Sequence, residues 1–351
     1  MRFRVAIVGA GIGAAHLDGY LANPERFAVT VICDLDAERA APLVTRASAD
    51  YVASLDEVIG RPDIDIVDIC LPPKLHKGAI VNALARGKHV VCEKPLVGSL
   101  TDFDEVEAAA VRHGRLVTPV FQYRFGQGIG QLVRLVNQGL AGRPLVATLE
   151  THWNRGADYY AVPWRGKWAT ELGGAVVGHA IHIHDLLVQV LGPAQQVQAR
   201  LATSVNPIEV EDCAAIIIET ASGALVTSSV TLGSADDRSR LRFCFSGLSA
   251  ESGIDAYNPG TAPWMFQARG PVAQAAVDEA LDGYEPHREG FVRQFELMHG
   301  ALIGTAPPPV PLKDARASLE LITAIYQADA TGQSVALPLD FGSPGYEGWT
   351  P

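Results

Sequence analysis

Apolar positions in the first 125 residues follow two alternating patterns. Short runs rich in branched residues end at glycine, proline or acidic positions, which is typical of buried strands. Segments with a helical spacing of apolar residues separate these runs. The patterns predict strands at 3–9, 27–34, 64–73, 88–95 and 115–122, and helices at 14–23, 36–47 (interrupted by Pro42), 76–87 and 100–114. Strands that alternate with helices in this way indicate a parallel sheet covered on both faces.

After about residue 125 the pattern changes. A helix at 127–139 leads to a strand at 143–154, a loop rich in glycine, tryptophan and arginine at 155–174, and a helix that contains histidines. Successive β-like runs between 195 and 269, with turn signals between them, favour a largely antiparallel sheet. Two helices, 287–304 and 313–332, come last. We therefore predict an α/β protein with two domains, 1–125 and 126–351.

Composition and charge narrow the class of protein. The 351 residues are 48% hydrophobic and 19% charged, which fits an ordinary globular protein of two domains. A net charge of −11 repels phosphate backbones, so we expect no nucleic-acid partner. The five cysteines are scattered without CxxC spacing, which favours reduced core residues over disulfides or zinc. The sequence begins without a signal-like apolar segment and holds no uninterrupted apolar stretch of bilayer length, so we expect a cytoplasmic protein without membrane contact.

A glycine-rich turn follows the first predicted strand and precedes the first helix. Gly9, Gly11 and Ala14 have the GxGxx[GA] spacing. The first glycine permits a tight turn, the second lets the backbone approach a pyrophosphate, and the small third residue allows close packing of helix on strand. We therefore predict that this turn, with Gly9, Gly11, Ile12 and Gly13, binds a dinucleotide.

Asp34 ends the second predicted strand. An acidic residue there accepts hydrogen bonds from the adenosine ribose and repels a 2′-phosphate. Leu35 follows it, where a basic residue would accommodate NADP. We therefore predict NAD as the cofactor in preference to NADP. The alternative interpretation of Asp34 is a solvated turn residue or the cap of the helix that starts near Asp36.

Glu93, Lys94 and Pro95 lie at the carboxyl end of a predicted parallel strand, where ligands of open α/β sheets bind. A residue before proline favours an extended backbone, which fixes Lys94 at the strand end. Beside a cationic nicotinamide, the charged form of its amine would be disfavoured, and the amine would exchange protons. An exposed lysine at a strand end is the alternative.

Several motifs together resemble the Gfo/Idh/MocA family of nicotinamide-dependent sugar and cyclitol oxidoreductases. They are GAGIGAAH, LPP with a histidine shortly after it, EKPL, VFQYRF, GGAVVGHAIHIHD and the two C-terminal helical segments, and they cover nearly the full length. The resemblance implies a Rossmann domain, then an α/β domain on an open, mainly antiparallel sheet that commonly mediates dimers or tetramers. We therefore expect a homodimer or homotetramer. Beyond the glycine turn and Asp34, the expected cofactor contacts are Leu71, Pro72, His76, Glu93, Lys94 and Gln122.

The resemblance also assigns roles in the histidine segment. Gly173 and Gly174 match the paired glycines of the family pattern, His182 its catalytic histidine, and Asp185 its final aspartate. The resemblance implies that His182 and the lysine of EKP flank the substrate carbon that faces the nicotinamide. Gly178 departs from the pattern, because many members carry an aspartate there that partners the histidine. This departure puts the usual aspartate–histidine relay in doubt.

The other two histidines have different positions on the predicted helix. Residues 178, 182 and 185 share one face, with His179 to one side and His184 pointing away from His182. His179 is interpreted either as a substrate-pocket residue or as a packed imidazole, and His184 as structural. Because no HExxH motif or cysteine cluster accompanies them, we predict no metal site.

Aromatic and cationic residues concentrate in the loop 155–174. Sugars present C–H faces and hydroxyl edges, which aromatic rings and hydrogen-bonding side chains recognise. Alternatively, the rings pack in the interior and the cations are solvated. The predicted substrate-binding residues are Arg124, His152, Tyr159, Trp164, Arg165, His179 and Asp185, with Asn154, Tyr284, Glu285 and His287 as weaker candidates.

Together these features predict an NAD-dependent dehydrogenase that oxidises a secondary hydroxyl of a sugar, sugar derivative or cyclitol. His182, assisted by Lys94, would accept the hydroxyl proton while hydride passes to the nicotinamide. Two alternatives stay open: an NAD-dependent glycosidase that oxidises its substrate transiently, and a non-catalytic regulator that binds a dinucleotide.

Overall fold

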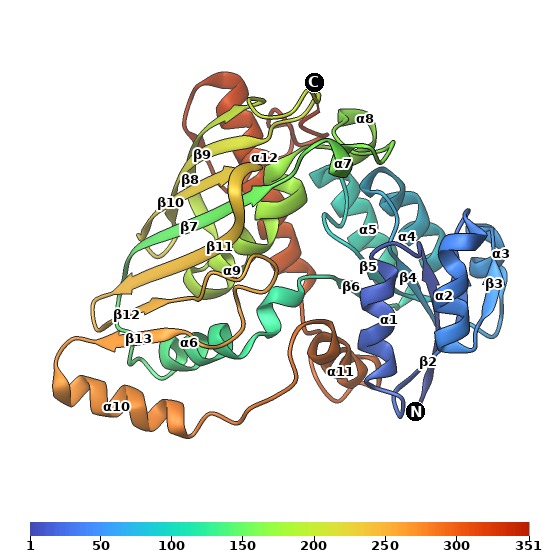
Figure 1. Cartoon of the computed structure of the whole chain (residues 1–351), viewed down its shortest axis with the longest axis horizontal. Coiled ribbons are helices and arrows are strands. Elements are labelled where there is room, and N and C mark those ends of the chain that lie inside the picture. Colours follow the sequence, from blue (N-terminus) through green and yellow to red (C-terminus); the bar gives the residue numbers. More distant parts are fainter. Residues whose placement is uncertain (351) are drawn as a thin grey trace. The chain divides into compact units, whose positions relative to one another are not determined.

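The computed structural model describes residues 1–350, without the side chain of Val272, and divides into two compact units (Figure 1). Unit 1 comprises Met1–Val120 and Phe291–Ala315, and unit 2 comprises Phe121–Gly290 and the chain from Arg316 onward. The sequence prediction divides the chain after residue 125 and keeps residues 291–315 in the second domain. The two divisions differ mainly because the helix α11 (Gly290–Leu302) packs in unit 1.

Unit 1 is built on a six-stranded sheet. Its order is β3-β2-β1-β4-β5-β6, and every neighbouring pair is parallel. This confirms the parallel sheet predicted from the alternation of strands and helices. The strands are β1 (Phe3–Val8), β2 (Phe27–Cys33), β3 (Asp50–Val52), β4 (Ile66–Ile69), β5 (His89–Cys92) and β6 (Val117–Pro119).

Helices follow each of the first five strands. One feature differs from the prediction, because Pro42 lies inside α2 and does not interrupt it. The proline is exposed, so water can bond the carbonyl oxygen that loses its donor there. The helical segments are α1 (Gly13–Leu21), α2 (Ala37–Ala47), α3 (Leu55–Gly60), η1 (Pro73–Leu75), α4 (His76–Ala85), α5 (Leu100–His113) and α11 (Gly290–Leu302).

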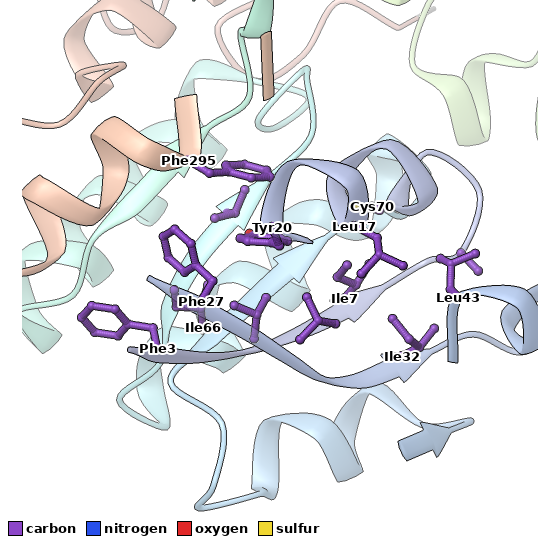
Figure 2. Packing of buried hydrophobic residues seen from close by; sticks show 14 of the residues in the cluster. Phe3, Ile7, Leu17, Tyr20, Phe27, Ile32, Leu43, Ile66, Cys70 and Phe295 are labelled. Carbon is purple, nitrogen blue, oxygen red and sulfur yellow. The ribbon is translucent and has the colours of Figure 1, made fainter. Parts of the chain in front are cut away.

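An aromatic cluster attaches α11 to the Rossmann-like sheet (Figure 2). The ring of Phe295 stacks on Tyr20 at 4.2 Å between centroids, and Tyr20 meets Phe27 edge-on at 5.3 Å. Gly19 makes the approach possible, since a Cβ there would lie 2.8 Å from the Phe295 ring. The side chain of Gln294 also donates to the carbonyl of Pro119 at 2.8 Å.

Unit 2 is built on an eight-stranded sheet of order β13-β12-β11-β7-β10-β9-β8-β14. The pair β7–β10 is parallel and the other pairs are antiparallel, which confirms the mainly antiparallel sheet. The strands are β7 (Pro144–Asn154), β8 (Ala194–Ala202), β9 (Cys213–Thr220), β10 (Leu225–Thr231), β11 (Gly233–Phe245), β12 (Leu248–Glu251), β13 (Met265–Ala268) and β14 (Val335–Ala336).

One face of this sheet is covered by helices and the other is open. Along β9 and β10 buried residues alternate with exposed ones such as Ile217 and Leu225. By length and composition Trp168–Leu191 could cross a membrane, but most of it is buried as a core helix of unit 2. The helical segments are η2 (Gln122–Phe125), α6 (Gln127–Asn137), α7 (Ala157–Tyr160), α8 (Trp168–Glu171), the π-turn η3 (Val176–Ala180), α9 (Ile181–Leu191), α10 (Pro271–Asp282) and α12 (Leu312–Thr331).

Candidate active site

The glycine turn at the end of β1 has the shape that a pyrophosphate needs. Gly9 has a φ of +103°, and a Cβ there would lie 2.3 Å from the carbonyl oxygen of Cys70. At Gly13 a Cβ would lie 2.7 Å from a side chain of β1, so helix and strand are in close contact. Gly11 faces open space, and Ile12 is 47% exposed at the start of α1. The turn therefore leaves its backbone accessible at a helix N-terminus and fits a dinucleotide.

Asp34 follows β2 directly and is buried. Its carboxylate accepts the backbone N–H of Ala10 at 2.7 Å and that of Asp36 at 2.9 Å. It also accepts two hydrogen bonds from the guanidinium of Arg39. Burial alone would raise the pKa of Asp34. The hydrogen bonds, of which that from Arg39 has the largest effect, lower this pKa below its ordinary value, so the carboxylate is an anion. Asp34 is therefore neither a solvated turn residue nor the cap of α2, which is Asp36.

His76 joins two loops on the carboxyl side of the sheet. Its Nε2 lies 2.8 Å from the carbonyl oxygen of Leu71, and its Nδ1 lies 2.8 Å from that of Pro95. The ring is completely buried. His76, predicted as a cofactor contact, thus holds the backbone of Leu71, which is another predicted contact, against that of Pro95.

A buried network of charged side chains ends at Glu93, the residue before Lys94. The ring of His16 on α1 is held between two carboxylates, with Nδ1 2.8 Å from Asp68 and Nε2 3.0 Å from Glu93. Burial, the largest single influence, lowers the pKa of His16, but the charge of Asp68, the hydrogen bond to it and the neighbouring Cys70 together raise this pKa well above its ordinary value. The other oxygen of Glu93 accepts the backbone N–H of Lys94 at 3.1 Å. The network thus fixes the backbone from which the half-buried Lys94 projects.

Within residues 1–350, possible metal-ligand atoms come close enough together to hold an ion in this same cluster. One atom from each of His16, Asp68 and Cys70 lies within 4.8 Å of the others. Burial, however, raises the pKa of the Cys70 thiol to about 12, so the thiol stays protonated. Both ring nitrogens of His16 already face carboxylates. The cluster is better described as a hydrogen-bonded ion network than as a metal site.

His182 lies in the first turn of α9 and is buried. Its ring stacks on Tyr123 at 4.4 Å between centroids and meets Phe121 edge-on at 6.2 Å. Gln122 lies between these two residues in η2 and is half-buried. The π-turn η3 precedes α9, and such turns often occur at functional sites. The imidazole therefore has a fixed orientation, as a catalytic base requires.

Arg124 and Asp185, both predicted to bind substrate, bind each other. Nε and Nη2 of the guanidinium donate to the two carboxylate oxygens at 2.6 and 2.7 Å. The hydroxyl of Ser318 on α12 donates a further hydrogen bond at 3.0 Å. Both charged side chains are almost completely buried. The pair connects η2 to α9, so it holds the segment that carries Tyr123 against the helix that carries His182.

His179 belongs to a chain of polar side chains that ends in a carboxylate. Its Nε2 lies 3.1 Å from the hydroxyl of Tyr159. Arg165 donates to the same hydroxyl, so the Tyr159 proton points to the His179 ring. Burial raises the pKa of Tyr159 to about 12, which keeps this proton in place. Arg165 in turn lies 3.4 Å from the carboxylate of Glu171 and packs on the ring of Trp164.

The carboxylate of Glu171 lies beside the glycine at position 178. A Cβ built on Gly178 would lie 3.9 Å from Oε1 of Glu171, which is buried. An acidic side chain from α8 thus occupies the space beside the helix where an aspartate would project. Glu171 was not among the predicted site residues, because nothing in its spacing relates it to the histidines.

His184 has the structural role that we predicted. Its Nε2 lies 2.9 Å from the hydroxyl of Ser228 on β10, and burial lowers the pKa of its ring to about 4. The imidazole is therefore neutral and fixes α9 against the inner face of the sheet.

His152 does not join the residues around His179. Successive residues of a strand point to opposite faces of the sheet. Trp153 is buried and meets His179 edge-on at 5.1 Å, whereas His152 contacts the hydroxyl of Ser229 at 2.9 Å on the open face. We predicted that His152 and Asn154 project toward the substrate cleft, but the structure places them on the open face of the sheet, and Trp153 is the residue of β7 that contacts His179.

The weaker candidates near residue 285 form a local cluster beside α6. The hydroxyl of Tyr284 lies 2.7 Å from Nε2 of His287 and packs against Gly130, while Glu285 is exposed.

The paired glycines have a structural reason. A Cβ at Gly174 would lie 1.8 Å from the carbonyl oxygen of Glu211, and at Gly173 it would lie 2.3 Å from the hydroxyl of Tyr326. The carboxylate of Glu211 accepts the backbone N–H groups of Gly174 and Val176, and the hydroxyl of Tyr326. This buried acid, which the sequence analysis missed, holds the start of the histidine helix.

We expect Glu211 to make stability fall as pH rises. Burial raises its pKa from 4.5 to about 7, so the folded protein holds a proton that the unfolded chain releases. The stabilisation is complete below pH 4.5 and is lost as pH rises toward 7, with a total of about 3 kcal/mol. In urea unfolding, the free energy of unfolding should fall less between pH 5 and pH 8 for Glu211→Gln than for the wild type. An equal loss in both proteins would contradict this assignment.

Two family models match the chain. The model for "Oxidoreductase family, NAD-binding Rossmann fold" matches residues 3–121, and that for the GFO/IDH/MocA C-terminal domain matches residues 129–250. The chain belongs to the GFO/IDH/MocA oxidoreductase family. The parallel sheet of unit 1 is therefore the NAD-binding Rossmann fold of this family, and the resemblance inferred from the motifs is confirmed.

Named relatives are similar over much of the chain. The WlbA dehydrogenase from Chromobacterium violaceum, solved with NADH and UDP-GlcNAcA, is 27% identical with a TM-score of 0.84 over 97% of each chain. Inositol 2-dehydrogenase from Rhodococcus erythropolis is 32% identical over 65% of this chain and 64% of its own length. An uncharacterised oxidoreductase from Schizosaccharomyces pombe is 28% identical over 70% of this chain and 68% of its own length. These curated relatives thus match over about two thirds of their length.

Proposed function

We propose that this protein is an NAD-dependent dehydrogenase that oxidises a secondary hydroxyl of a sugar, sugar derivative or cyclitol. The observation that carries the proposal is the fixed imidazole of His182, held by Tyr123 and by the Arg124–Asp185 pair, in a chain that also carries the NAD-binding turn. The dehydrogenases that resemble it, one named for inositol and one solved with a nucleotide sugar, support this class of substrate.

The proposed proton chemistry uses an imidazole and an amine. His182 accepts the proton of the substrate hydroxyl, for which an imidazole near neutral pH is suited. The amine of Lys94 donates a hydrogen bond to the same oxygen and stabilises the developing alkoxide. NAD, when bound, supplies the hydride acceptor. Glu93 and His16 keep the backbone of Lys94 in place throughout.

The proposed substrate site uses the loop that precedes α9. Tyr159, Trp164 and Arg165 pack on one another, with the Arg165 guanidinium 3.9 Å above the Tyr159 ring and 4.4 Å from that of Trp164. Aromatic faces combined with hydrogen-bond donors suit a sugar ring and its hydroxyl groups. His179 takes part in this site by holding the hydroxyl of Tyr159. The proposal includes a homodimer or homotetramer, which the exposed apolar residues on the open sheet face support.

Lys94→Ala and His182→Ala should each lower turnover by about 100-fold or more while cofactor binding is kept. Turnover is followed by the absorbance of reduced nicotinamide with NAD and a panel of monosaccharides, anhydrosugars, glycosides and inositols. Net accumulation of reduced cofactor distinguishes a dehydrogenase from a glycosidase that oxidises only transiently. The matched controls are Lys313→Ala, an exposed lysine, and His113→Ala at the end of α5. Full activity in both site variants would refute the assignment.

A further inference from the structure

The carboxylate of Asp34 has no acceptor position left for a ribose. One oxygen accepts the N–H of Ala10 and Nε of Arg39, and the other accepts the N–H of Asp36 and Nη2 of Arg39. A carboxylate offers about four lone-pair positions, and these four bonds use them. The hydroxyls of an adenosine ribose can therefore bond Asp34 only if Arg39 gives up at least one of its two positions.

Arg39 is placed to make this exchange. It belongs to the first turn of α2, and its side chain is 54% exposed while that of Asp34 is 4% exposed. An exposed guanidinium is readily hydrated, so water replaces part of what its hydrogen bonds to Asp34 contribute when the side chain turns away. The two backbone N–H groups stay on Asp34 in either state. The guanidinium is thus the exchangeable partner of this carboxylate.

We propose that Arg39 sets the choice between NAD and NADP, and that the protein binds both. With NAD, Arg39 yields its position on Asp34 to the ribose hydroxyls. With NADP, the guanidinium pairs with the 2′-phosphate and neutralises the charge that Asp34 would otherwise repel. We predicted NAD in preference to NADP because Leu35, directly after Asp34, is not basic. The cation is supplied instead from the following helix.

This inference rests on the NAD-binding fold of unit 1 and is independent of the roles proposed for Lys94 and His182. It is tested by titrating the full-length protein with NADH and with NADPH and following nicotinamide fluorescence. The wild type should bind NADPH within about 10-fold of NADH. Arg39→Ala should weaken NADPH about 10- to 100-fold, the loss expected for hydrogen bonds to a charged group, and should not weaken NADH.

Two further variants make the result specific. Arg46 lies on the same helix, is also exposed and pairs with Asp18, so Arg46→Ala should leave the ratio of the two affinities unchanged. Asp34→Ala should favour NADPH, and the gain should disappear in the double variant Asp34→Ala/Arg39→Ala. The variants should change the affinity for adenosine 2′,5′-bisphosphate as they change that for NADPH, and the affinity for AMP as they change that for NADH. This result would locate the effect at the 2′ position.

Two results would overturn the inference. The first is a wild type that binds NADPH more than about 1,000-fold more weakly than NADH, well beyond what one ion pair can offset. The second is an Arg39→Ala variant in which both cofactors change by the same factor. If both cofactors bind as expected but no sugar or cyclitol is oxidised, the proposed function fails while the inference about Arg39 stands.

Discussion

Replacing Asp185 with alanine is expected to lower the free energy of unfolding by about 3–5 kcal/mol, because the change leaves the charge of Arg124 buried without its carboxylate. The two side chains are only 4% and 1% exposed and share two short hydrogen bonds. The loss should appear in urea unfolding followed by circular dichroism. Activity should fall with it, since the pair holds η2 and α9, whose aromatic rings and helix turn orient His182.

Two controls separate the charge from the packing. Ser318→Ala removes one hydrogen bond to Asp185 and should cost only about 1 kcal/mol. The double variant Arg124→Met/Asp185→Leu removes both charges and should recover most of the stability that Asp185→Ala loses. A loss below about 1 kcal/mol in Asp185→Ala would show that the pair is not the connection between these segments.

The periodic features of the sequence predicted the architecture well. Each strand of the parallel sheet except the short β3 appears as an apolar run, since both faces of such a sheet are buried. The glycine turn was predictable because the chain itself must bend there, as the positive φ of Gly9 shows. The placement of α11 was not, because the contact of Phe295 with Tyr20 joins positions 275 residues apart, a separation that local patterns do not encode.

The position of His152 on the open face follows from the alternation of residues along β7. Along β7 the buried residues Ala147 and Leu149 alternate with partly exposed Thr148 and Glu150. Extending this alternation assigns Trp153 to the buried face and His152 to the open one.

The charged residues of the site were harder to place. Arg124 and Asp185 are individually plausible as substrate contacts, and their mutual pairing depends on how η2 packs on α9. Glu211 and Glu171 each act on the histidine helix from outside it, through Gly174 and beside Gly178. Such partners are set by tertiary packing, so the sequence gives the residue types but not the pairs.

The ion network under Lys94 provides the second large effect. His16→Asn should lower the free energy of unfolding by about 3–5 kcal/mol, because it leaves Asp68 and Glu93 buried without the cation between them. His299→Ala is a control, since this half-buried ring lies edge-on to Phe3 and Phe27 and bonds the carbonyl of Met1 but faces no buried carboxylate in these contacts, so it should cost less, about 1 kcal/mol for the hydrogen bond.

The pH dependence identifies the cause of this loss. The pKa of His16 is raised in the folded protein, chiefly by Asp68 against the effect of burial, so the folded state binds a proton that the unfolded chain releases above about pH 6.5. The stabilisation is complete below that pH and is lost as pH rises through the raised pKa. Unfolding of the wild type measured from pH 6 to 9 should therefore show a decline that His16→Asn lacks. A parallel decline in both proteins would mean that the ring is neutral and that packing alone holds Glu93 and the backbone of Lys94.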